Sequence, residues 1–313
     1  MSKNIFKHNL AIVIATKDRP TQLEGVLSSI CAQSILPDQV VVVDGGDVTI
    51  ESIVEQFTEL KTCYMRVYPP ALTKQKNAGI TSVSHDIGLV GFIDDDIVFE
   101  AGALEAMMHF WDDAPEGIGG ASFNLTDFSN SFSWLKSIPQ RIFFIDNRCF
   151  GRVLKSGFNT PIWNAHEDRM VEWLGGGYTV WRKRVFDHWQ FDEWYPGSGL
   201  WEDVHFSYRV AKNNQLVVVA NARAAHAEPP ISPKGQVQLG KTQIFNWLYF
   251  VRNNPELSTP MCLWACIGRT FMNLIKGVAG VNLSFILRGL GNSMGLVKGA
   301  LWATSQMRRK SIG

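Results

Sequence analysis

The sequence predicts an α/β fold with a mostly parallel central sheet, followed by a C-terminal helical segment. Two observations carry this prediction. Short apolar runs of strand length alternate with stretches of helical periodicity in the first third of the chain, and the residues from 241 onward are helical in character. Strands that are apolar on both faces and alternate with helices are typical of parallel sheets covered by helices on both sides.

The individual elements follow from local patterns. Residues 10–15 (LAIVIA) and 40–43 (VVVV) are continuous apolar runs that end at turn-forming residues, which indicates buried strands. Between them, Leu23, Val26 and Ile30 recur at helical spacing. The other elements expected up to residue 93 are a helix over 50–60, a strand over 65–68, a helix over 74–82 and a strand over 87–93.

The pattern changes after residue 123. Residues 123–163 are rich in aromatic side chains without regular spacing, and we expect them to form an irregular insertion over the functional site. Strand signals return over 177–181 and 216–220, and they flank a helix near 204–212.

Charge is unevenly distributed along the 313 residues. Nine of the 30 Lys and Arg residues but only one of the 29 acidic residues, Glu256, lie in 241–313, so this segment carries +8 and residues 1–240 carry −7. The hydrophobic content of 46% supports a sizeable core. We therefore expect a main domain over 1–240, which includes the insertion, and a basic, apolar helical tail over 241–313 that contacts something anionic.

Cysteine usage and hydropathy indicate the compartment. The five cysteines form no CxxC pair, which argues against a disulfide framework and favours a reducing environment. The N-terminal apolar run is too short for a signal peptide, and no stretch of 18 uncharged apolar residues predicts a transmembrane helix. The expectation is a cytoplasmic protein at the inner face of the cell membrane.

Polar residues follow three of the predicted strands, at 16–19, 44–47 and 94–96. Because ligands of parallel sheets bind outside the carboxyl ends of the strands, we expect these segments to share one edge of the sheet. The three adjacent aspartates at 94–96 repel one another, so they need a cation or strong hydrogen-bond donors. Their hard oxygens suit Mg²⁺ or Mn²⁺, and the alternative is a solvated acidic turn.

The order of these motifs resembles that of family 2 glycosyltransferases, which have the GT-A fold and use nucleotide sugars. The resemblance covers roughly residues 9–228, and it is specific as an ordered set although each motif alone is weak. The motifs are TKDR (16–19), DGGD (44–47), KNAG (76–79), DDD (94–96), WLGGGYTVWRKRVF (173–186), FDE (191–193), WEDVHFSYRV (201–210) and the late His226.

The resemblance implies a nucleotide-binding site and a metal site. The implied nucleotide-binding residues are Thr16, Asp18, Arg19, Asp44, Lys76, Asp94 and Asp95. Asp96, Asp94 and His226 would hold Mn²⁺ or Mg²⁺. Asp44 would accept a hydrogen bond from a base N–H, with a turn-forming Asp before Gly as its alternative. Asp18 could equally cap a helix, and Lys76 could be a solvated helix residue.

Residues 201–203 supply a second acidic centre. An acceptor hydroxyl must lose its proton as it attacks the sugar, which calls for a carboxylate base. The resemblance gives this role to Asp203, with Glu202 orienting the acceptor, although acids are also favoured at a helix N-terminus. Gly176 and Gly177 would let the backbone approach the sugar. Trp173 and Trp201 could stack on sugar faces or belong to the core.

The resemblance implies a metal-dependent, inverting hexosyltransferase that moves a sugar from a nucleoside diphosphate to a glycan or lipid-linked acceptor in cell-surface polysaccharide synthesis. One alternative is a catalytically silent scaffold of the same fold. Another is a sugar-nucleotide pyrophosphorylase, which would need a glycine-rich phosphate loop where residues 16–20 contain no glycine. The acidic main domain gives little support to nucleic-acid binding.

The basic tail favours membrane contact. If it formed one helix, Arg269, Lys276, Arg288 and Lys298 would fall within an arc of about 120°, beside a large apolar surface. Six glycines between 277 and 299 make two shorter helices the expectation. The alternative is a helical hairpin that packs on protein.

Overall fold

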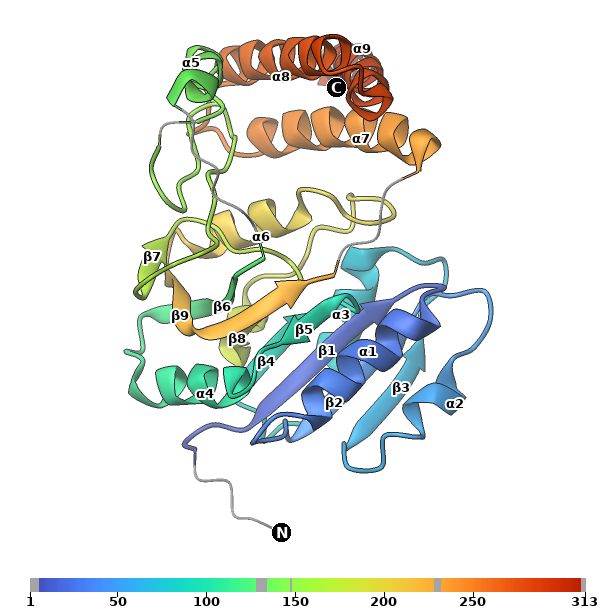
Figure 1. Ribbon diagram of the computed structural model, residues 1–313, viewed down its shortest axis with the longest axis vertical. Helices are drawn as coiled ribbons and strands as arrows, with labels where there is room; N and C mark the ends of the chain where they lie inside the picture. The colour runs from blue at the N-terminus through green and yellow to red at the C-terminus, as the bar shows by residue number, and fades with distance from the viewer. Residues whose placement is uncertain (1–5, 128–133, 147, 228–231, 311–313) are drawn as a thin grey trace. The chain divides into compact units, whose positions relative to one another are not determined.

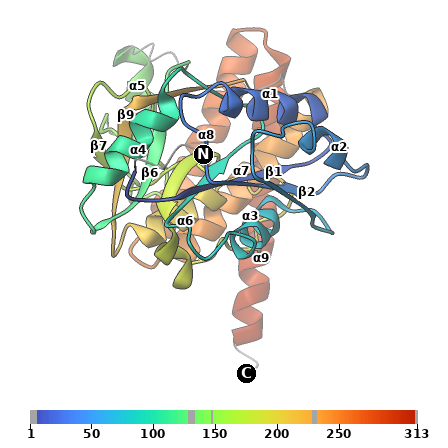
Figure 2. The same ribbon diagram turned by 90° about the horizontal axis from the view of Figure 1, so that it is seen from below.

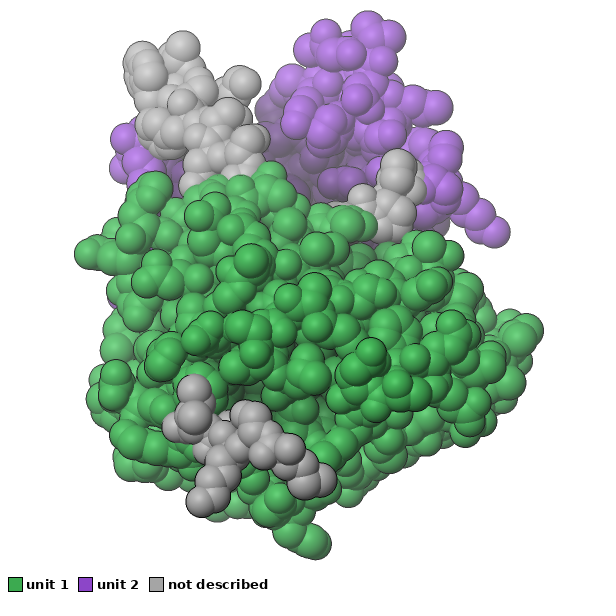
Figure 3. All heavy atoms as spheres, turned by 60° about the horizontal axis from the view of Figure 1, so that its bottom comes forward, with its two compact units in different colours: residues 1–130, 162–228 green, residues 131–161, 229–313 purple. Residues whose placement is uncertain are grey.

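The computed structural model describes residues 6–127, 134–146, 148–227 and 232–310 (Figure 1). The chain divides into two compact units, coloured separately in Figure 3. Unit 1 comprises residues 1–130 and 162–228, and unit 2 comprises residues 131–161 and 229–313. Most of the predicted insertion therefore groups with the C-terminal segment. Part of it, including Phe128 and Phe132, lies outside the described residues.

Unit 1 is built on a nine-stranded sheet in the order β3-β2-β1-β4-β8-β6-β9-β5, with β7 paired to β9. The first four strands in this order are parallel to one another, as predicted. They are β1 (Leu10–Thr16), β2 (Gln39–Asp44), β3 (Thr62–Arg66) and β4 (Leu89–Ile93). The central pair is buried on both faces, which explains why 10–15 and 40–43 are apolar without alternation.

The second half of the sheet is mixed. β8 runs antiparallel to β4 and β6, whereas β6 and β9 are parallel. The strands are β5 (Ile97–Phe99), β6 (Ile118–Leu125), β7 (Arg169–Val171), β8 (Tyr178–Arg182) and β9 (Gln215–His226). The predicted strands at 177–181 and 216–220 correspond to β8 and the first part of β9, and β5, β6 and β7 were not predicted.

Helices cover both faces of the sheet. Figure 2 shows α1 on one face and α3 on the other. The helices of unit 1 are α1 (Pro20–Cys31), α2 (Glu51–Val54), α3 (Leu72–Thr81), α4 (Ala103–Asp113) and α6 (Glu202–Val210), with a 3-10 helix at Lys183–Asp187. The predicted helix over 50–60 shrinks to the single turn of α2.

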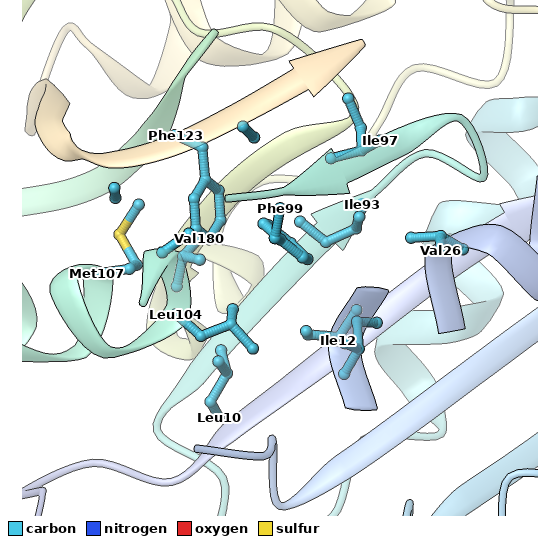
Figure 4. Packing of buried hydrophobic residues seen from close by; sticks show 14 of the residues in the cluster. Leu10, Ile12, Val26, Ile93, Ile97, Phe99, Leu104, Met107, Phe123 and Val180 are labelled. Atoms are coloured by element: carbon cyan, nitrogen blue, oxygen red, sulfur yellow. The ribbon is translucent and has the colours of Figure 1, made fainter. Parts of the chain in front are cut away.

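The main core lies between the sheet and the face covered by α1 and α4. Figure 4 shows Val26 of α1 and Leu104 and Met107 of α4 packed with strand residues such as Ile12 and Phe123. On the opposite face, the aromatic rings of Phe186, Phe191 and Phe206 stack on one another. This packing fixes α3 and α6, which carry the functional side chains described below.

Unit 2 contains α5 (Trp134–Ile142), α7 (Pro233–Arg252), α8 (Thr259–Ala279) and α9 (Leu283–Lys310). The helical segment is interrupted between α8 and α9, which confirms the expectation of two shorter helices for this region. The four basic residues do not form a single stripe on one helix, because Arg269 and Lys276 lie on α8 whereas Arg288 and Lys298 lie on α9. In the described part of the chain, no helix is both long and apolar enough to cross a membrane.

Glycines allow α7 and α9 to pack closely. A Cβ on Gly291 or Gly295 would collide with the carbonyl oxygen of Val237 or Lys241, respectively. The residue numbers of the contacting positions increase together along the two helices, from Val237 and Gly291 to Lys241 and Gly295. α7 and α9 therefore run parallel, and α8 connects them in the opposite direction. Glycines that weaken an isolated helix therefore serve here as contact positions between helices.

Candidate active site

A cavity of about 460 Å³ opens at the carboxyl edge of the parallel strands. Its lining residues come from the ends of β1 and β4, the start of α3 and a loop before α6. They are Ala15, Thr16, Lys17, Arg19, Pro70, Ala71, Leu72, Gln75, Asp94, Asp95, Asp96, Gly197 and Ser198. The sheet therefore brings together Thr16, Arg19 and the aspartate triplet, as the strand-end pattern predicts.

The aspartates are held by specific donors. The Thr16 hydroxyl donates to Asp95 Oδ2 at 2.7 Å, and the Arg19 guanidinium contacts Asp95 at 2.6 Å and Asp96 at 2.8 Å. Asp95 and Asp96 are only 3% and 8% exposed. The alternative of a solvated acidic turn is therefore wrong for these two residues.

The same environment separates the pKa values of the neighbouring aspartates. Burial raises the pKa of Asp95 to about 6, against the opposing effects of Thr16 and Arg19. Burial would also raise the pKa of Asp96, but His226 and Arg19 together outweigh it and lower that pKa below its ordinary value. Asp96 is consequently the carboxylate of the pair that stays ionised and available as a ligand.

Asp96 also meets the late histidine of the sequence. Asp96 Oδ1 lies 3.1 Å from His226 Nε2, a distance that suits an ion pair, although this buried oxygen accepts no hydrogen bond from the residues that the structure describes. A buried carboxylate oxygen beside an imidazole nitrogen fits a divalent cation chemically. The described residues contain no group of three or more His, Cys, Asp or Glu side chains arranged around a metal position. A Mg²⁺ or Mn²⁺ ion that is shared with substrate phosphates commonly has only one or two protein ligands, so this pair is compatible with such an ion.

Asp44 and Asp18 organise the turns at the ends of β1 and β2. Asp44 is buried, and it accepts hydrogen bonds from the backbone N–H of Gly46 at 2.6 Å and the hydroxyl of Tyr64 at 2.7 Å. These contacts give Asp44 the turn-forming role that was the alternative to base binding. Binding of a base by Asp44 stays a prediction. Asp18 has a left-handed backbone (φ 52°) and accepts from the N–H of Asp47, so it does not cap α1.

Lys76 lies at the centre of a buried charged cluster. Its side chain is buried, so the alternative of a solvated helix residue is wrong. Nζ donates to Glu202 Oε1 at 2.6 Å and to the Gly176 carbonyl at 2.8 Å, and it lies 5.0 Å from the centroid of the Phe191 ring. Burial would lower the pKa of Lys76, but Glu202 and Asp94 outweigh this and raise it. Lys76 thus stays a cation in a dry environment.

The acids of this cluster outnumber its single cation. Burial raises the pKa of Glu202 to about 7, and it also raises the pKa of Asp203 and of Asp94. Asp203 Oδ1 accepts from the N–H of Val204 at 2.8 Å at the start of α6. Glu202 Oε2 is buried without a hydrogen-bond partner among the described residues. The raised pKa values of these carboxyl groups favour the uptake of a proton by the cluster.

Gly176 and Gly177 permit the close approach of these groups. A Cβ on Gly176 would lie 2.8 Å from both Lys76 Nζ and Glu202 Oε1, and one on Gly177 would overlap the Asp94 carboxylate. The Asp94 N–H also donates to the Gly177 carbonyl at 2.8 Å. These glycines make room for protein side chains, in addition to any contact with a sugar.

We expect Gly177→Ala to lower the free energy of unfolding by about 1–3 kcal/mol, because the new methyl group must displace Asp94. Urea unfolding followed by tryptophan fluorescence measures the change. Gly117→Ala is the matched control, since a Cβ there meets nothing within 4 Å. Equal unfolding midpoints for the two variants would contradict the packing described here.

Other residues were misjudged or missed by sequence reasoning. Trp173 and Trp201 are both buried, which favours their core alternative over stacking on a sugar. Gln75 was missed, although its amide donates to the carbonyls of Thr16 and Val43 and so ties the ends of β1 and β2 together. Tyr178 was also missed, and burial with the nearby Asp203 and Asp94 raises its pKa. The sequence signal that could have identified Tyr178 as a site residue is its position directly after Gly177.

Comparison with known proteins places the chain among glycosyltransferases. The model of the family "Glycosyl transferase family 2" matches residues 11–166. The mannosyltransferase PcManGT from Pyrobaculum calidifontis, solved with GDP-Man and Mn²⁺, is similar with a TM-score of 0.57 and 14% identity over 96% of this chain and 88% of that chain. No functionally curated protein matches this chain in sequence.

Two further solved structures share the fold. GalNAc-T7, solved with UDP, GalNAc and Mn²⁺, has a TM-score of 0.53 and 12% identity over 90% of this chain and 59% of that chain. Residues 1–349 of S. aureus TarS, solved with UDP, have a TM-score of 0.50 and 14% identity over 95% of this chain and 92% of that chain. At these identities the likeness concerns the fold.

Proposed function

Because this chain belongs to glycosyl transferase family 2 and is a nucleotide-sugar-dependent glycosyltransferase with the GT-A fold, we propose that it is a metal-dependent, inverting hexosyltransferase. The observation that carries the proposal is the cavity at the strand ends, where the buried Asp96 oxygen faces His226 at 3.1 Å. The hexose-bearing ligands GDP-Man and GalNAc in structures of similar fold support the hexosyl assignment.

The donor nucleotide would occupy this cavity. Thr16, Arg19 and Asp95 line it, and Asp18 and Asp44 lie in the turns after β1 and β2. Asp96 and His226 would hold the ion. Asp94 stays a predicted third ligand, since the described residues form no group of three such side chains around a metal position. When bound, Mn²⁺ or Mg²⁺ supplies positive charge that offsets the negative charge of the departing nucleoside diphosphate.

The acceptor would bind beside Glu202 and Asp203. In the proposed reaction, Asp203 takes the proton of the acceptor hydroxyl while the oxygen forms a bond to the anomeric carbon. The bond from that carbon to the diphosphate oxygen breaks on the opposite face, so the configuration inverts. The buried Oε2 of Glu202, which has no hydrogen-bond partner among the described residues, supports its role in orienting the acceptor, and Lys76 holds the other oxygen of that carboxylate.

We infer that the acceptor is a glycan or a lipid-linked glycan in cell-surface polysaccharide synthesis, assembled at the cytoplasmic face of the membrane. The support is the basic, apolar segment over 241–313, which carries +8 and exposes apolar side chains on α8 and α9. Membrane contact would place the enzyme beside an acceptor carried by lipid.

Calorimetric titration of UDP, GDP, CDP and dTDP, each with and without Mn²⁺, tests the donor site. We expect one diphosphate to bind only with the ion, and Asp96→Asn to weaken this binding by about 10–100-fold. Asp113→Asn, at an exposed position at the end of α4, is the control. If the folded wild-type protein binds none of the four, the silent-scaffold alternative replaces this proposal.

A further inference from the structure

A second cavity, of about 430 Å³, lies in unit 2 between α7 and α9. We call it the α7/α9 groove. Its lining residues are Lys241, Ser293, Met294, Val297, Lys298 and Leu301. It thus combines two ammonium groups and a hydroxyl with three apolar side chains, and none of its lining residues lines the cavity at the strand ends.

The charge in the α7/α9 groove is unbalanced. The described lining contains no carboxylate, and Glu256 is the single acidic residue in the sequence from 233 to 310. Lys298 Nζ lies 3.8 Å from the centroid of the Phe245 ring, and burial together with the charge of Lys241 lowers the pKa of Lys298. Two like charges held close together would be stabilised by an anion between them.

The apolar side of the groove continues along the surface of α9. Leu290, Met294, Val297 and Leu301 are between 48% and 66% exposed. Their spacing places them within an arc of about 60° on the helix, and Lys298 lies about 40° outside that arc. Such a stripe with cations at its edge is the arrangement of a helix that lies at a membrane interface.

A further cation and an aromatic ring lie near the same helix pair. The guanidinium of Arg252 lies 5.2 Å from the centroid of the Trp302 ring. Trp302 follows directly after Leu301 on α9. Tryptophan and arginine side chains are suited to the depth of lipid head groups.

We propose that the α7/α9 groove binds the phosphate group of an anionic membrane lipid, with Lys241 and Lys298 on the phosphate and an acyl chain along Val297 and Leu301. A soluble anion would satisfy the lysines but would leave the apolar stripe of α9 in water, whereas a lipid accounts for both. The inference deepens the proposed membrane contact by naming its site, and it does not depend on the sugar chemistry.

Co-sedimentation of the full chain with vesicles tests the inference. We expect binding to phosphatidylcholine vesicles that contain 30% phosphatidylglycerol and little binding to pure phosphatidylcholine. Lys241→Gln/Lys298→Gln should weaken the binding at least about tenfold, because each lysine near an anionic surface contributes favourably. Val297→Ser/Leu301→Ser should weaken it as well, since the acyl contact is lost.

The control is Lys61→Gln/Lys183→Gln, which removes the same charge from unit 1 and should bind as the wild type does. Circular dichroism establishes that every variant is folded. If the wild type binds the vesicles and the groove variants bind them with the same affinity, the α7/α9 groove is not the lipid site, although the protein still contacts membranes. Displacement from the vesicles by millimolar inorganic phosphate would overturn the lipid in favour of a soluble anion. Absence of vesicle binding by the wild type would overturn both, and the nucleotide titration would be unaffected.

Discussion

Asp203→Asn should lower kcat by about 10²–10⁴-fold while leaving the affinity for the nucleoside diphosphate within about twofold of wild type. Asparagine keeps the shape of the side chain and can still accept from the N–H of Val204, so α6 should begin as before. It cannot take a proton from the acceptor. Because burial raises the pKa of Asp203, the wild-type carboxylate is a stronger base than an exposed aspartate.

Steady-state transfer assays and calorimetry on the same protein preparation separate these two effects. Asp187→Asn, at an exposed position in the 3-10 helix, controls for the loss of one negative charge. If Asp203→Asn retains more than a tenth of wild-type kcat while Glu202→Gln loses activity a hundredfold, the base is Glu202 and the assignment made here is wrong.

Lys76→Met should lower the free energy of unfolding by about 3–5 kcal/mol at pH 8, because it leaves Glu202 buried without its partner. Urea denaturation measures the change. Lys74→Met makes the same substitution two residues earlier on α3, at a half-buried position, and should cost much less. Adding Glu202→Gln to Lys76→Met should recover part of the loss, since it removes the unpaired carboxylate.

The cost of Lys76→Met should also depend on pH. The pKa of Glu202 in the folded protein, about 7, lies above its ordinary value of 4.5, so protonation of this group favours the folded state. Its contribution to stability is present below pH 4.5 and is lost as the pH rises to about 7. Without Lys76 the carboxylate is harder still to ionise, so the difference between wild type and variant should grow above pH 7 and shrink toward pH 5. A pH-independent difference would mean that Lys76 acts through packing alone.

Continuous apolar runs made much of unit 1 predictable. Residues 10–15, 40–43 and 89–93 form central parallel strands, where burial on both faces leaves an unambiguous signal, although the last of these was predicted to begin two residues earlier, at 87. β3 was placed a few residues too late, at 65–68 instead of Thr62–Arg66, because it is a half-buried edge strand with a weak apolar pattern. The carboxylates at 94–96 were informative because they end such a strand, and the structure does bring them together with Thr16 and Arg19.

The buried pairing of Lys76 with Glu202 could not be predicted. The two residues are 126 positions apart, and a lysine after Gln75 on a weakly amphipathic helix carries no local sign of burial. The same limit applies to the grouping of 131–161 with the C-terminal helices, because local periodicity contains no information about a partner a hundred residues away.

That grouping has a consequence for how the protein is made. The indole of Trp247 donates to the Ser156 carbonyl and that of Trp264 to the Ile142 carbonyl, and a Cβ on Gly268 would collide with Phe143. During synthesis, residues 131–161 leave the ribosome long before these partners exist, so they interrupt unit 1 as a segment with nothing to pack against. β9 can complete the sheet of unit 1 while this segment is still unpacked. Unit 2, in contrast, can form only after α7 and α8 have been synthesised. In a chain that ended near residue 240, residues 131–161 would never find their packing partners. We expect such a truncated protein to aggregate instead of yielding a smaller enzyme.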